Sequence, residues 1–425
     1  MPNKQNRLLV KTCLTVKVFV LAFALLFVAE AKGQEVGRID ADVAINFATE
    51  TLAAKLKYDY IATEENEAVL KFYLNKAFDV KTVRCRLCRS FNFDRQTQPR
   101  PSLLINLTEP LTKGKRLTIE IDYGGSLDGL YNREHKFLEL GLDNLWYPAH
   151  KNTSEFHFVY RVSVKTDQPN FHLVSNGRPE RNAGGWLVKS RVPDFDINLV
   201  LGEGLTIKQY KQGMYDLQLV SKGMPEEASA TLLNGMKEIL DFYNSSFGSL
   251  DRQREVTAVF RPFLEPQFGY FRRGYFVLPQ TDNVRDLLFP IAHELSHYWW
   301  LKAGQQHAWL NESFAEYSAM LFLRKDRGVE VFLTRLEDKR KNSLNLPPVY
   351  GFDRTKNRQV TPGVFYRKGV VKLSDLEKDM GEQKFMEFLR QVAKAKVSET
   401  DALIEIVAQV SSREIADRFL QNLKN

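Results

Sequence analysis

One short stretch of the sequence places its side chains in the pattern of a metal site. Residues 291–297 read Ile-Ala-His-Glu-Leu-Ser-His, so His293 and His297 are four positions apart and Glu294 follows the first histidine. On a helix, positions four apart lie on one face, one turn above each other. Two imidazoles placed in this way can bind one metal ion, and the carboxylate beside them can reach a water molecule at that ion. The stretch therefore predicts a helix that carries two metal ligands and a general base.

A second stretch supplies candidates for the third ligand. Residues 309–317 read Trp-Leu-Asn-Glu-Ser-Phe-Ala-Glu-Tyr, which places Glu312 and Glu316 one helical turn apart. A catalytic zinc needs a third protein ligand and an open position for water. We expect Glu312 to be that ligand, with Glu316 hydrogen-bonded to a ligating histidine and Asn311 in the same surrounding shell. An exchange of roles between Glu312 and Glu316 is the alternative.

The segment from His293 to Tyr317 resembles the zinc signature of the membrane alanyl aminopeptidase family, which are gluzincin metallopeptidases with a thermolysin-like catalytic domain. In that family H-E-x-x-H precedes a helix of the W-L-N-E-G-F-A type, and this chain has Ser313 where glycine is usual. Residues 365–369, Phe-Tyr-Arg-Lys-Gly, resemble the family's Y-x-K-G motif. The resemblance implies a peptidase with one Zn²⁺ per chain, in which Tyr366 stabilises the oxyanion and Glu294 is the base.

The sequence departs from the family pattern in the spacing of the ligands. Family members usually have eighteen residues between the second histidine and the third ligand, whereas His297 and Glu312 enclose fourteen. Glu316 would satisfy the count of eighteen, but the local Trp-Leu-Asn-Glu text aligns at Glu312, and a shorter surface loop is easily accommodated. The sequence also ends soon after the catalytic part, without the family's large C-terminal helical domain, so we expect a short, divergent member with a more open cleft.

A further departure concerns recognition of the substrate's amino group. The family's G-A-M-E-N motif corresponds to Gly269, Tyr270, Phe271, Arg272 and Arg273, so that Arg272 replaces the glutamate that binds a free amine. A guanidinium repels an ammonium and favours a carboxylate. Strict aminopeptidase specificity is therefore not expected. The two arginines are equally well interpreted as substrate contacts, together with Gly269 and Tyr270, or as solvated charges in a turn.

Two domains follow from the pattern of apolar residues. Residues 36–208 alternate apolar and polar positions between turn signals, which favours an antiparallel β-sandwich, and they resemble the family's saddle-shaped N-terminal domain. The alternating positions include Leu70, Phe72 and Leu74; Leu117, Ile119, Ile121 and Tyr123; and Phe158, Tyr160, Val162 and Val164. Residues 215–425 are mainly helical and are expected to form a thermolysin-like catalytic domain, giving an α+β multidomain fold. Helices are expected at about 225–243, 286–302, 312–326, 329–342, 368–379, 382–396 and 400–420.

The first 33 residues have the features of a cleaved signal peptide. A basic stretch from Lys4 to Lys17 is followed by an apolar run from Val18 to Ala29 and by small residues at Ala29 and Ala31. The run has twelve residues, short of the roughly 20 that a membrane-spanning helix needs. We expect an exported protein, periplasmic or extracellular, with no stable membrane span after cleavage. An uncleaved signal anchor that tethers the protein to a membrane is the alternative.

The remaining composition limits the partners. The formal net charge is +8, but the basic residues are spread along the chain without a basic, aromatic-rich run. Nucleic-acid binding is therefore not expected. The expected partner is a peptide or protein substrate. Around Cys85 and Cys88, the residues Val83, Cys85 and Leu87 alternate as in a strand, where positions three apart point to opposite faces. We therefore interpret them as two separate thiols.

Two other functional classes stay open: a zinc hydrolase of different specificity, and a non-catalytic zinc-binding protein.

Overall fold

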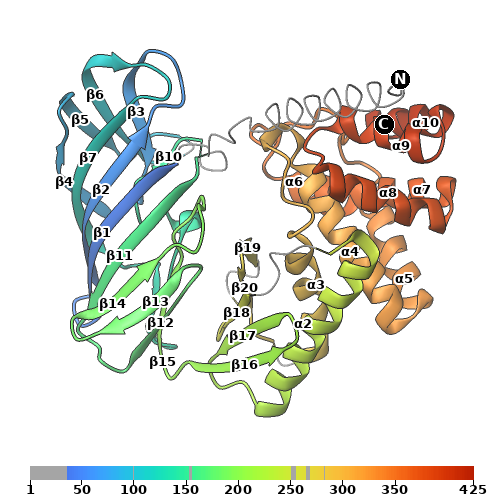
Figure 1. Ribbon diagram of the computed structural model, residues 1–425, viewed down its shortest axis with the longest axis horizontal. Coiled ribbons are helices and arrows are strands. Elements are labelled where there is room, and N and C mark those ends of the chain that lie inside the picture. The colour runs from blue at the N-terminus through green and yellow to red at the C-terminus, as the bar shows by residue number, and fades with distance from the viewer. Residues whose placement is uncertain (1–35, 99, 153–155, 250–254, 265–268, 282) are drawn as a thin grey trace, which may run out of the picture.

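The chain folds into a β-sheet domain, a mixed sheet and a cluster of helices (Figure 1). The computed structural model describes residues 36–425 except 99, 153–155, 250–254, 265–268 and 282. The predicted signal peptide at 1–33 lies outside the described residues. Within those residues, no helix combines the length and the apolar character needed to cross a membrane.

Two sheets packed face to face form the N-terminal domain, at the left of Figure 1. The larger has seven strands in the order β13-β14-β11-β1-β2-β7-β4, and its neighbours are antiparallel except β1 and β11. Its strands are β1 (Gly37–Asn46), β2 (Thr51–Ile61), β4 (Phe78–Arg84), β7 (Arg116–Ser126), β11 (Phe158–Thr166), β13 (Arg178–Asn182) and β14 (Gly185–Lys189). The smaller sheet has the order β10-β3-β6-β5. Its strands are β3 (Glu67–Tyr73), β5 (Cys88–Asp94), β6 (Ser102–Leu111) and β10 (Ala149–His150).

The sandwich core consists of the residues that alternation predicted. All eleven alternating apolar positions named from the sequence are buried, at 4% exposure or less. Alternate side chains of a strand point to opposite faces, so one face of each strand enters the core while the other meets solvent. The prediction of a half-buried antiparallel sheet is confirmed for these strands, except that β11 pairs parallel with β1 on one side.

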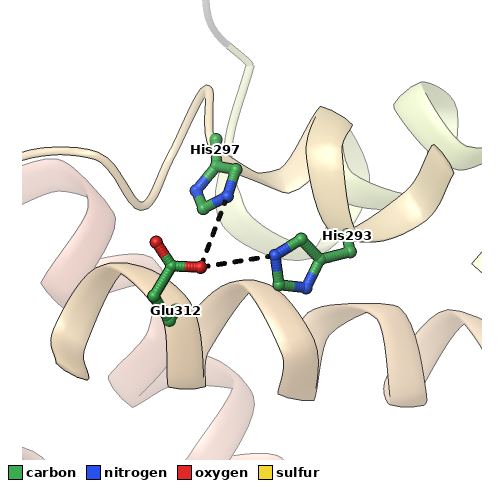
Figure 2. A group of neighbouring side chains, drawn as sticks. All are labelled: His293, His297 and Glu312. Carbon is green, nitrogen blue, oxygen red and sulfur yellow. Dashed lines mark ion pairs between the residues drawn. The ribbon is translucent and has the colours of Figure 1, made fainter. Parts of the chain in front are cut away.

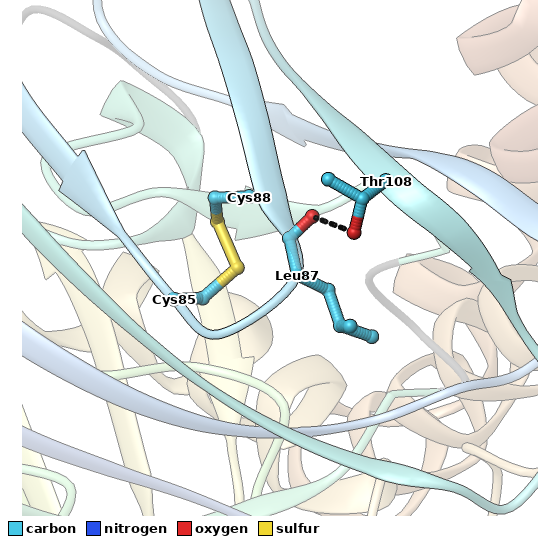
Figure 3. Close-up of a disulfide and its surroundings, with 4 residues drawn as sticks. All are labelled: Cys85, Leu87, Cys88 and Thr108. Carbon is cyan, nitrogen blue, oxygen red and sulfur yellow. Dashed lines mark hydrogen bonds between the residues drawn. A yellow bond between two sulfur atoms is a disulfide. The ribbon is translucent and has the colours of Figure 1, made fainter.

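Cys85 and Cys88 form a disulfide, which contradicts their interpretation as separate thiols (Figure 3). The strand β4 ends at Arg84 and β5 begins at Cys88, so the two cysteines flank a turn rather than lie in one strand. The Cys88 N–H donates to the Cys85 carbonyl at 3.3 Å, and the turn brings the two Cα atoms to 5.1 Å. The alternation of Val83, Cys85 and Leu87 was misleading because the strand ends within it.

A third sheet, β12-β15-β9-β8, lies at the junction with the rest of the molecule. Its strands are β8 (Tyr131–Asn132), β9 (Phe137–Leu140), β12 (Phe171–Ser175) and β15 (Leu199–Glu203). Phe137, Val174 and Val200 from this sheet share a buried cluster with Val220, Val259 and Val277 of the following sheet. The two domains are therefore joined by a continuous apolar contact.

A five-stranded sheet, β16-β17-β18-β20-β19, begins the second part of the chain and lies at the lower centre of Figure 1. Its strands are β16 (Thr206–Gln212), β17 (Tyr215–Ser221), β18 (Glu255–Arg261), β19 (Tyr270–Arg272) and β20 (Tyr275–Pro279). The strand β16 begins just before the predicted end of the first domain at 208 and pairs with β17. The edge strand β19 is antiparallel to β20. Between β17 and β18 the chain forms α2 (Glu226–Phe247), whose apolar face packs in the same core as this sheet.

The remaining residues form the helices at the right of Figure 1. They are α3 (Leu288–Ser296), α4 (Trp309–Arg327), α5 (Val329–Lys341), α6 (Thr361–Gly363), α7 (Gly369–Met380), α8 (Glu382–Ala395), α9 (Thr400–Val410) and α10 (Arg413–Lys424). A π-helix at Val364–Lys368 joins α6 to α7. The predicted helix at 400–420 is two helices, because the chain turns at Ser411 and Ser412 caps α10 by accepting from the Ile415 N–H. The predicted helix at 286–302 ends earlier, at Ser296.

Candidate metal centre

The two histidines lie in helix α3 and at its C-terminal cap, and α2 holds this helix through a hydrogen bond. The Tyr243 hydroxyl of α2 donates to the Ala292 carbonyl at 2.9 Å. His293 and Glu294 lie in the last turns of α3, and His297 is its C-terminal cap. After the helix ends, Trp299 and Trp300 enter the core at 3% and 4% exposure. Because both tryptophans are buried beneath the site, the chain turns sharply after His297.

The helix α4 carries the two glutamates, and its start is held by Asn311. The Asn311 side-chain oxygen accepts from the Lys302 and Ala303 N–H groups at 3.1 and 3.0 Å, and its amide nitrogen donates to the Ala303 carbonyl at 2.9 Å. Asn311 therefore orders the loop that joins α3 to α4. Glu312 lies in the first turn of α4 and Glu316 one turn later, so both face α3.

Three potential ligand atoms converge between α3 and α4 (Figure 2). A carboxylate oxygen, Glu312 Oε2, lies 3.5 Å from His293 Nε2 and 3.9 Å from His297 Nε2. The three ligand atoms all lie within 4.8 Å of one another. The two imidazole rings are nearly perpendicular, with an interplanar angle of 85°. The structure thus brings together the three residues that the sequence predicted as ligands.

The donor set fits a zinc ion. Around a tetrahedral zinc with bonds of about 2.1 Å, ligand atoms are separated by about 3.4 Å, close to the distances from Glu312 Oε2 to the two imidazole nitrogens. The other nitrogen of each ring is already bonded: His293 Nδ1 donates to Glu316 Oε2 at 2.9 Å, and His297 Nδ1 donates to the Trp300 carbonyl at 3.1 Å. Both acceptors orient the rings so that Nε2 faces the shared space. Two imidazoles and one carboxylate leave a fourth position for water or substrate.

Charge at the centre is balanced by close pairing. Burial alone would lower the pKa of His293, but hydrogen bonds with Glu312 and Glu316 outweigh it and raise that pKa to about 10. Burial lowers the pKa of His297 to about 4. For Glu312 burial opposes ionisation, yet the neighbouring histidines lower its pKa to about 2. The carboxylate of Glu312 is therefore ionised and available as a ligand.

Glu316 has two partners, one on each oxygen. Its Oε2 accepts from His293, and its Oε1 accepts from Lys339 Nζ of α5 at 2.5 Å. Burial would raise the pKa of Glu316, but the bond with His293 and the charge of Lys339 lower it to about 2. Lys339 was not identified from the sequence. The available signal was its position on the apolar stripe of α5 formed by Phe332 and Leu336, where a lysine is out of place.

Glu294 borders a cavity of about 390 Å³ that is also lined by His293, one of the three candidate ligands. Burial raises the pKa of Glu294 to about 7, even though His293 lowers it. A carboxylate with a pKa near neutrality can both accept and return a proton. The cavity wall is mainly apolar, and its lining residues include Leu278, Pro279, Leu287, Phe289 and Pro290, with His293, Glu316 and Tyr366 at its polar end.

Tyr366 reaches the centre from the π-helix. Its hydroxyl donates to Glu312 Oε2 at 2.6 Å, and its ring stacks on His293 with centroids 5.5 Å apart. Burial and the carboxylate of Glu312 raise the pKa of this hydroxyl, so it remains protonated and can act as a donor. Tyr366 also lines the cavity, so a protonated donor lies next to Glu312 at the edge of that space.

The four residues predicted as possible substrate contacts, Gly269, Tyr270, Arg272 and Arg273, lie at different places. Gly269 lines the cavity, and a Cβ there would come within 3.0 Å of Glu294 Oε1 and 2.4 Å of Leu278 Cδ2, so only glycine fits. Tyr270, Arg272 and Arg273 are not among the residues that line the cavity. The Arg272 guanidinium is buried between the domains, where it donates to Asp196 Oδ2 at 2.6 Å and to Asp143 Oδ2 at 3.0 Å. Tyr270 lies under this guanidinium, with its ring centroid 4.6 Å from Cζ.

Comparison with known proteins finds relatives in structure only. No protein-family model and no curated protein matches this sequence. Among solved structures, the M1 zinc metallopeptidase from Deinococcus radiodurans is similar with a TM-score of 0.67 at 17% identity, covering 92% of this chain and 93% of that chain. A mutant of the same metallopeptidase bound to a Tyr-Ser-Ala substrate matches equally, covering 92% of this chain and 94% of that chain. Yeast LTA4 hydrolase has a TM-score of 0.69 at 16% identity, covering 90% of this chain and 66% of that chain.

These likenesses extend over nearly the whole described chain, through both the sandwich and the helical part. They agree with the α+β multidomain architecture expected from the sequence. The chain therefore has the fold of the M1 zinc metallopeptidases.

Proposed function

We propose that this protein is a zinc-dependent metallopeptidase that hydrolyses peptide bonds, related in mechanism to the membrane alanyl aminopeptidases. The observation that carries the proposal is the convergence of His293, His297 and Glu312 at one point, beside a cavity that Glu294 and Tyr366 also reach. The M1 metallopeptidase fold, and the peptide substrate held by one structural neighbour, support the same reaction class.

We assign the zinc ligands to the two Nε2 atoms and to the Glu312 carboxylate. A zinc ion held there would supply Lewis acidity, which polarises a scissile carbonyl and makes a nearby water molecule more acidic. Glu316 and the Trp300 carbonyl hold the two rings in the ligating orientation. Zinc is favoured over harder cations because two of the three donors are imidazole nitrogens.

Glu294 has the proton-transfer role in this proposal. Its buried carboxylate takes the proton of the attacking water as the new C–O bond forms, and delivers it to the leaving nitrogen as the C–N bond breaks. A pKa raised to about 7 suits both halves of this transfer near neutral pH. Gly269 leaves the space beside the carboxylate open, because a Cβ at that position would come within 3.0 Å of Glu294 Oε1.

Tyr366 has the role of oxyanion donor. Its hydroxyl, now bonded to Glu312 Oε2, turns to the carbonyl oxygen of the substrate as negative charge develops there. A donor that is kept protonated by its surroundings can give this hydrogen bond without releasing its own proton. Such a bond is stronger in the transition state than in the ground state, which is what accelerates the reaction.

The choice of substrate differs from a strict aminopeptidase in this proposal. The position of the amine-binding glutamate is occupied by Arg272, whose guanidinium pairs with Asp196 and Asp143. The apolar cavity wall favours a bulky apolar side chain next to the scissile bond.

We also propose that the protein is exported, which the Cys85–Cys88 disulfide supports because disulfides persist in oxidising compartments.

The test combines metal content with hydrolysis of two fluorogenic peptides that share a Phe residue, one with a free and one with a blocked N-terminus. We expect about one zinc per chain and cleavage of the blocked peptide as well as the free one. Cleavage of the free peptide alone would show that amine selection survives without the glutamate. Zinc without cleavage of either would favour a non-catalytic or differently specific zinc protein, and a protein without bound metal would contradict the proposal.

The matched control is Glu294→Gln, which keeps the size of the side chain and removes its basicity. We expect this variant to bind zinc as the wild type does, while kcat falls on the order of 100- to 10,000-fold. Unchanged turnover would exclude Glu294 as the base. Loss of zinc together with turnover would show that Glu294 supports the metal instead.

A further inference from the structure

Lys339 is a buried cation at the back of the metal centre. It lies on α5, its exposed fraction is 8%, and its ammonium group donates to Glu316 Oε1 at 2.5 Å and to the Tyr366 carbonyl at 2.9 Å. A buried ammonium is costly unless it is paired and hydrogen-bonded. Both of these partners belong to groups around the metal centre, so the lysine is placed where its bonds affect that centre.

The bonds of Lys339 close a ring of contacts around the ligands. The ring runs from His293 to Glu316, to Lys339, to the backbone of Tyr366, and through its hydroxyl to Glu312, which contacts His293. Four helical elements contribute: α3, α4, α5 and the π-helix. Lys339 is the member of this ring that is supplied by α5, and it contacts neither the substrate cavity nor a ligand atom in the described structure.

The two hydrogen bonds of Lys339 hold two different groups of the proposed active site, the Glu316 carboxylate and the backbone of Tyr366. Because each oxygen of Glu316 has one partner, Lys339 on Oε1 fixes the orientation in which Oε2 accepts from His293. The second bond pins the carbonyl of Tyr366 and so places its ring and hydroxyl relative to the ligands. A single side chain thus couples the orientation of a metal ligand to the position of the oxyanion donor.

We propose that Lys339 is a positioning residue that sets both the metal affinity and the placement of Tyr366. This inference rests on the proposed function, since the second effect requires that Tyr366 acts on a substrate. The first effect does not, because metal affinity is measured without any substrate. Residues that orient the ligands of a metal typically contribute about 10- to 100-fold to affinity or activity.

The competing interpretation is that Lys339 only links α5 to its neighbouring helices. The next residue on α5, Arg340, provides a control for this interpretation. Arg340, adjacent on α5, pairs with Asp375 of α7 at 2.7 Å and makes no contact with the ring. Lys339→Met removes the ammonium and keeps much of the apolar stem, whereas Arg340→Met removes a neighbouring cation and a link between α5 and α7. A merely structural role would give the two variants similar behaviour once their thermal stability is taken into account.

The experiment measures zinc affinity by competition with a chelator, the absorption spectrum of the Co²⁺-substituted protein, and kcat and KM separately. For Lys339→Met we expect affinity about 10- to 100-fold weaker, an altered Co²⁺ spectrum, and a lower kcat with KM nearly unchanged. Arg340→Met should keep wild-type affinity and spectrum. Wild-type affinity and spectrum in Lys339→Met would overturn the proposal, as would equal losses in Arg340→Met.

Two further results keep the outcomes distinct. If Lys339→Met does not fold, the same measurements are made on Lys339→Gln, because glutamine keeps a hydrogen-bond donor without the charge. Weaker zinc binding by this variant supports the proposal, and unchanged zinc binding overturns it. If the wild-type protein binds zinc but cleaves no peptide, the proposed function fails while the affinity comparison still tests the role of Lys339.

Discussion

At the candidate metal centre, His293, His297 and Tyr366 each use one polar atom to fix their orientation and leave another for a second partner. His293 gives Nδ1 to Glu316 and keeps Nε2 for the shared space, while His297 gives Nδ1 to the Trp300 carbonyl. Tyr366 uses its hydroxyl toward Glu312 and its carbonyl toward Lys339. Because these bonds fix orientation as well as position, the effect of removing one of them can be predicted separately for binding and for turnover.

Removal of the Tyr366 hydroxyl separates these two effects. In Tyr366→Phe we expect kcat to fall on the order of 100- to 1,000-fold, because the oxyanion loses its donor, while KM and zinc content stay close to wild type. Steady-state kinetics together with metal analysis check this. An effect on KM alone would indicate that the tyrosine binds substrate rather than stabilises the transition state.

His150, in the sandwich core, makes stability depend on pH. Its Nδ1 accepts from the Asn152 N–H at 3.1 Å, and its Nε2 lies 3.2 Å from the Tyr60 hydroxyl, which itself donates to Glu67. Both ring nitrogens are therefore satisfied when the ring is neutral. Burial lowers the pKa of His150 to about 4, from 6.5 when the chain is unfolded.

A lowered pKa in the folded state means that the neutral ring stabilises the protein above pH 6.5, and that this contribution is lost as the pH falls through about 4. The loss amounts to about 3–4 kcal/mol at most, since the pKa falls from 6.5 to about 4 and each pKa unit corresponds to roughly 1.4 kcal/mol. Urea unfolding between pH 4 and 7 measures it. His150→Gln, which does not titrate, should flatten the profile, whereas the same change at the exposed His172 should leave it unaltered.

At the level of secondary structure, the π-helix is the element that places Tyr366. Its backbone carbonyls at Phe365 and Tyr366 accept from the Ser313 hydroxyl of α4 at 2.7 Å and from Lys339 of α5. A π-helix is uncommon and often lies at functional sites, since its wider turn leaves carbonyls available to other donors. The serine at 313, where the related signature usually has glycine, thus has a defined partner.

Close packing between α4 and the start of α7 gives a test of this element. A Cβ on Gly369 would lie 2.0 Å from Ser313 Oγ and 2.9 Å from Ser313 Cβ. We expect Gly369→Ala to destabilise the protein by about 1–3 kcal/mol through overpacking. The displaced π-helix should also lower kcat on the order of 10- to 100-fold, because Tyr366 moves from its place.

Two variants serve as comparisons for Gly369→Ala. Gly304→Ala should change neither stability nor kcat, because no heavy atom lies within 4 Å of the added Cβ and its φ is −72°. Adding Ser313→Gly to Gly369→Ala should recover part of the lost stability by making room. Thermal unfolding and kinetics check both, and a Gly369→Ala protein with wild-type properties would contradict the packing argument.

Across the whole molecule, the two domains are locked by buried charges as well as by apolar contact. Arg272 on β19 reaches Asp196 and Asp143 of the N-terminal domain, and Arg261 on β18 donates to Glu139 of β9 at 2.6 Å. Arg272 and Asp196 are buried, at 6% and 0% exposure. The edge strand β19 contacts the candidate metal centre as well, because the rings of Phe271 and His297 have centroids 5.8 Å apart.

Loss of the Arg272 side chain should weaken this junction strongly. Arg272→Met leaves Asp196 buried without its counter-charge, so we expect a cost of about 3–5 kcal/mol in urea unfolding. Arg413→Met, which removes an exposed pair with Glu405, should leave the free energy of unfolding nearly unchanged, because solvent screens this pair. A loss of activity only toward carboxylate-bearing peptides, with stability unchanged, would show instead that Arg272 contacts substrate.

The sequence was sufficient wherever the information is local. Helical periodicity places His293 and His297 on one face, and the same periodicity places Glu312 and Glu316 on one face of the next helix, so the convergence of the three ligand atoms follows once α3 and α4 pack together. Strand alternation likewise predicted the buried positions of the sandwich. Both patterns depend only on residues a few positions apart in the sequence.

The tertiary structure alone decided the contacts between distant segments. Lys339 meets Glu316 across 23 positions in the sequence and Tyr366 across 27, and no local pattern specifies which carboxylate or carbonyl a buried lysine will find. From the sequence Arg272 was equally well a substrate contact or a solvated charge, whereas in the structure it is buried and pairs with Asp196, 76 positions away in the other domain. The Cys85–Cys88 disulfide was missed for a related reason: where a strand ends depends on its partners, and the turn between β4 and β5 brings the two sulfurs together.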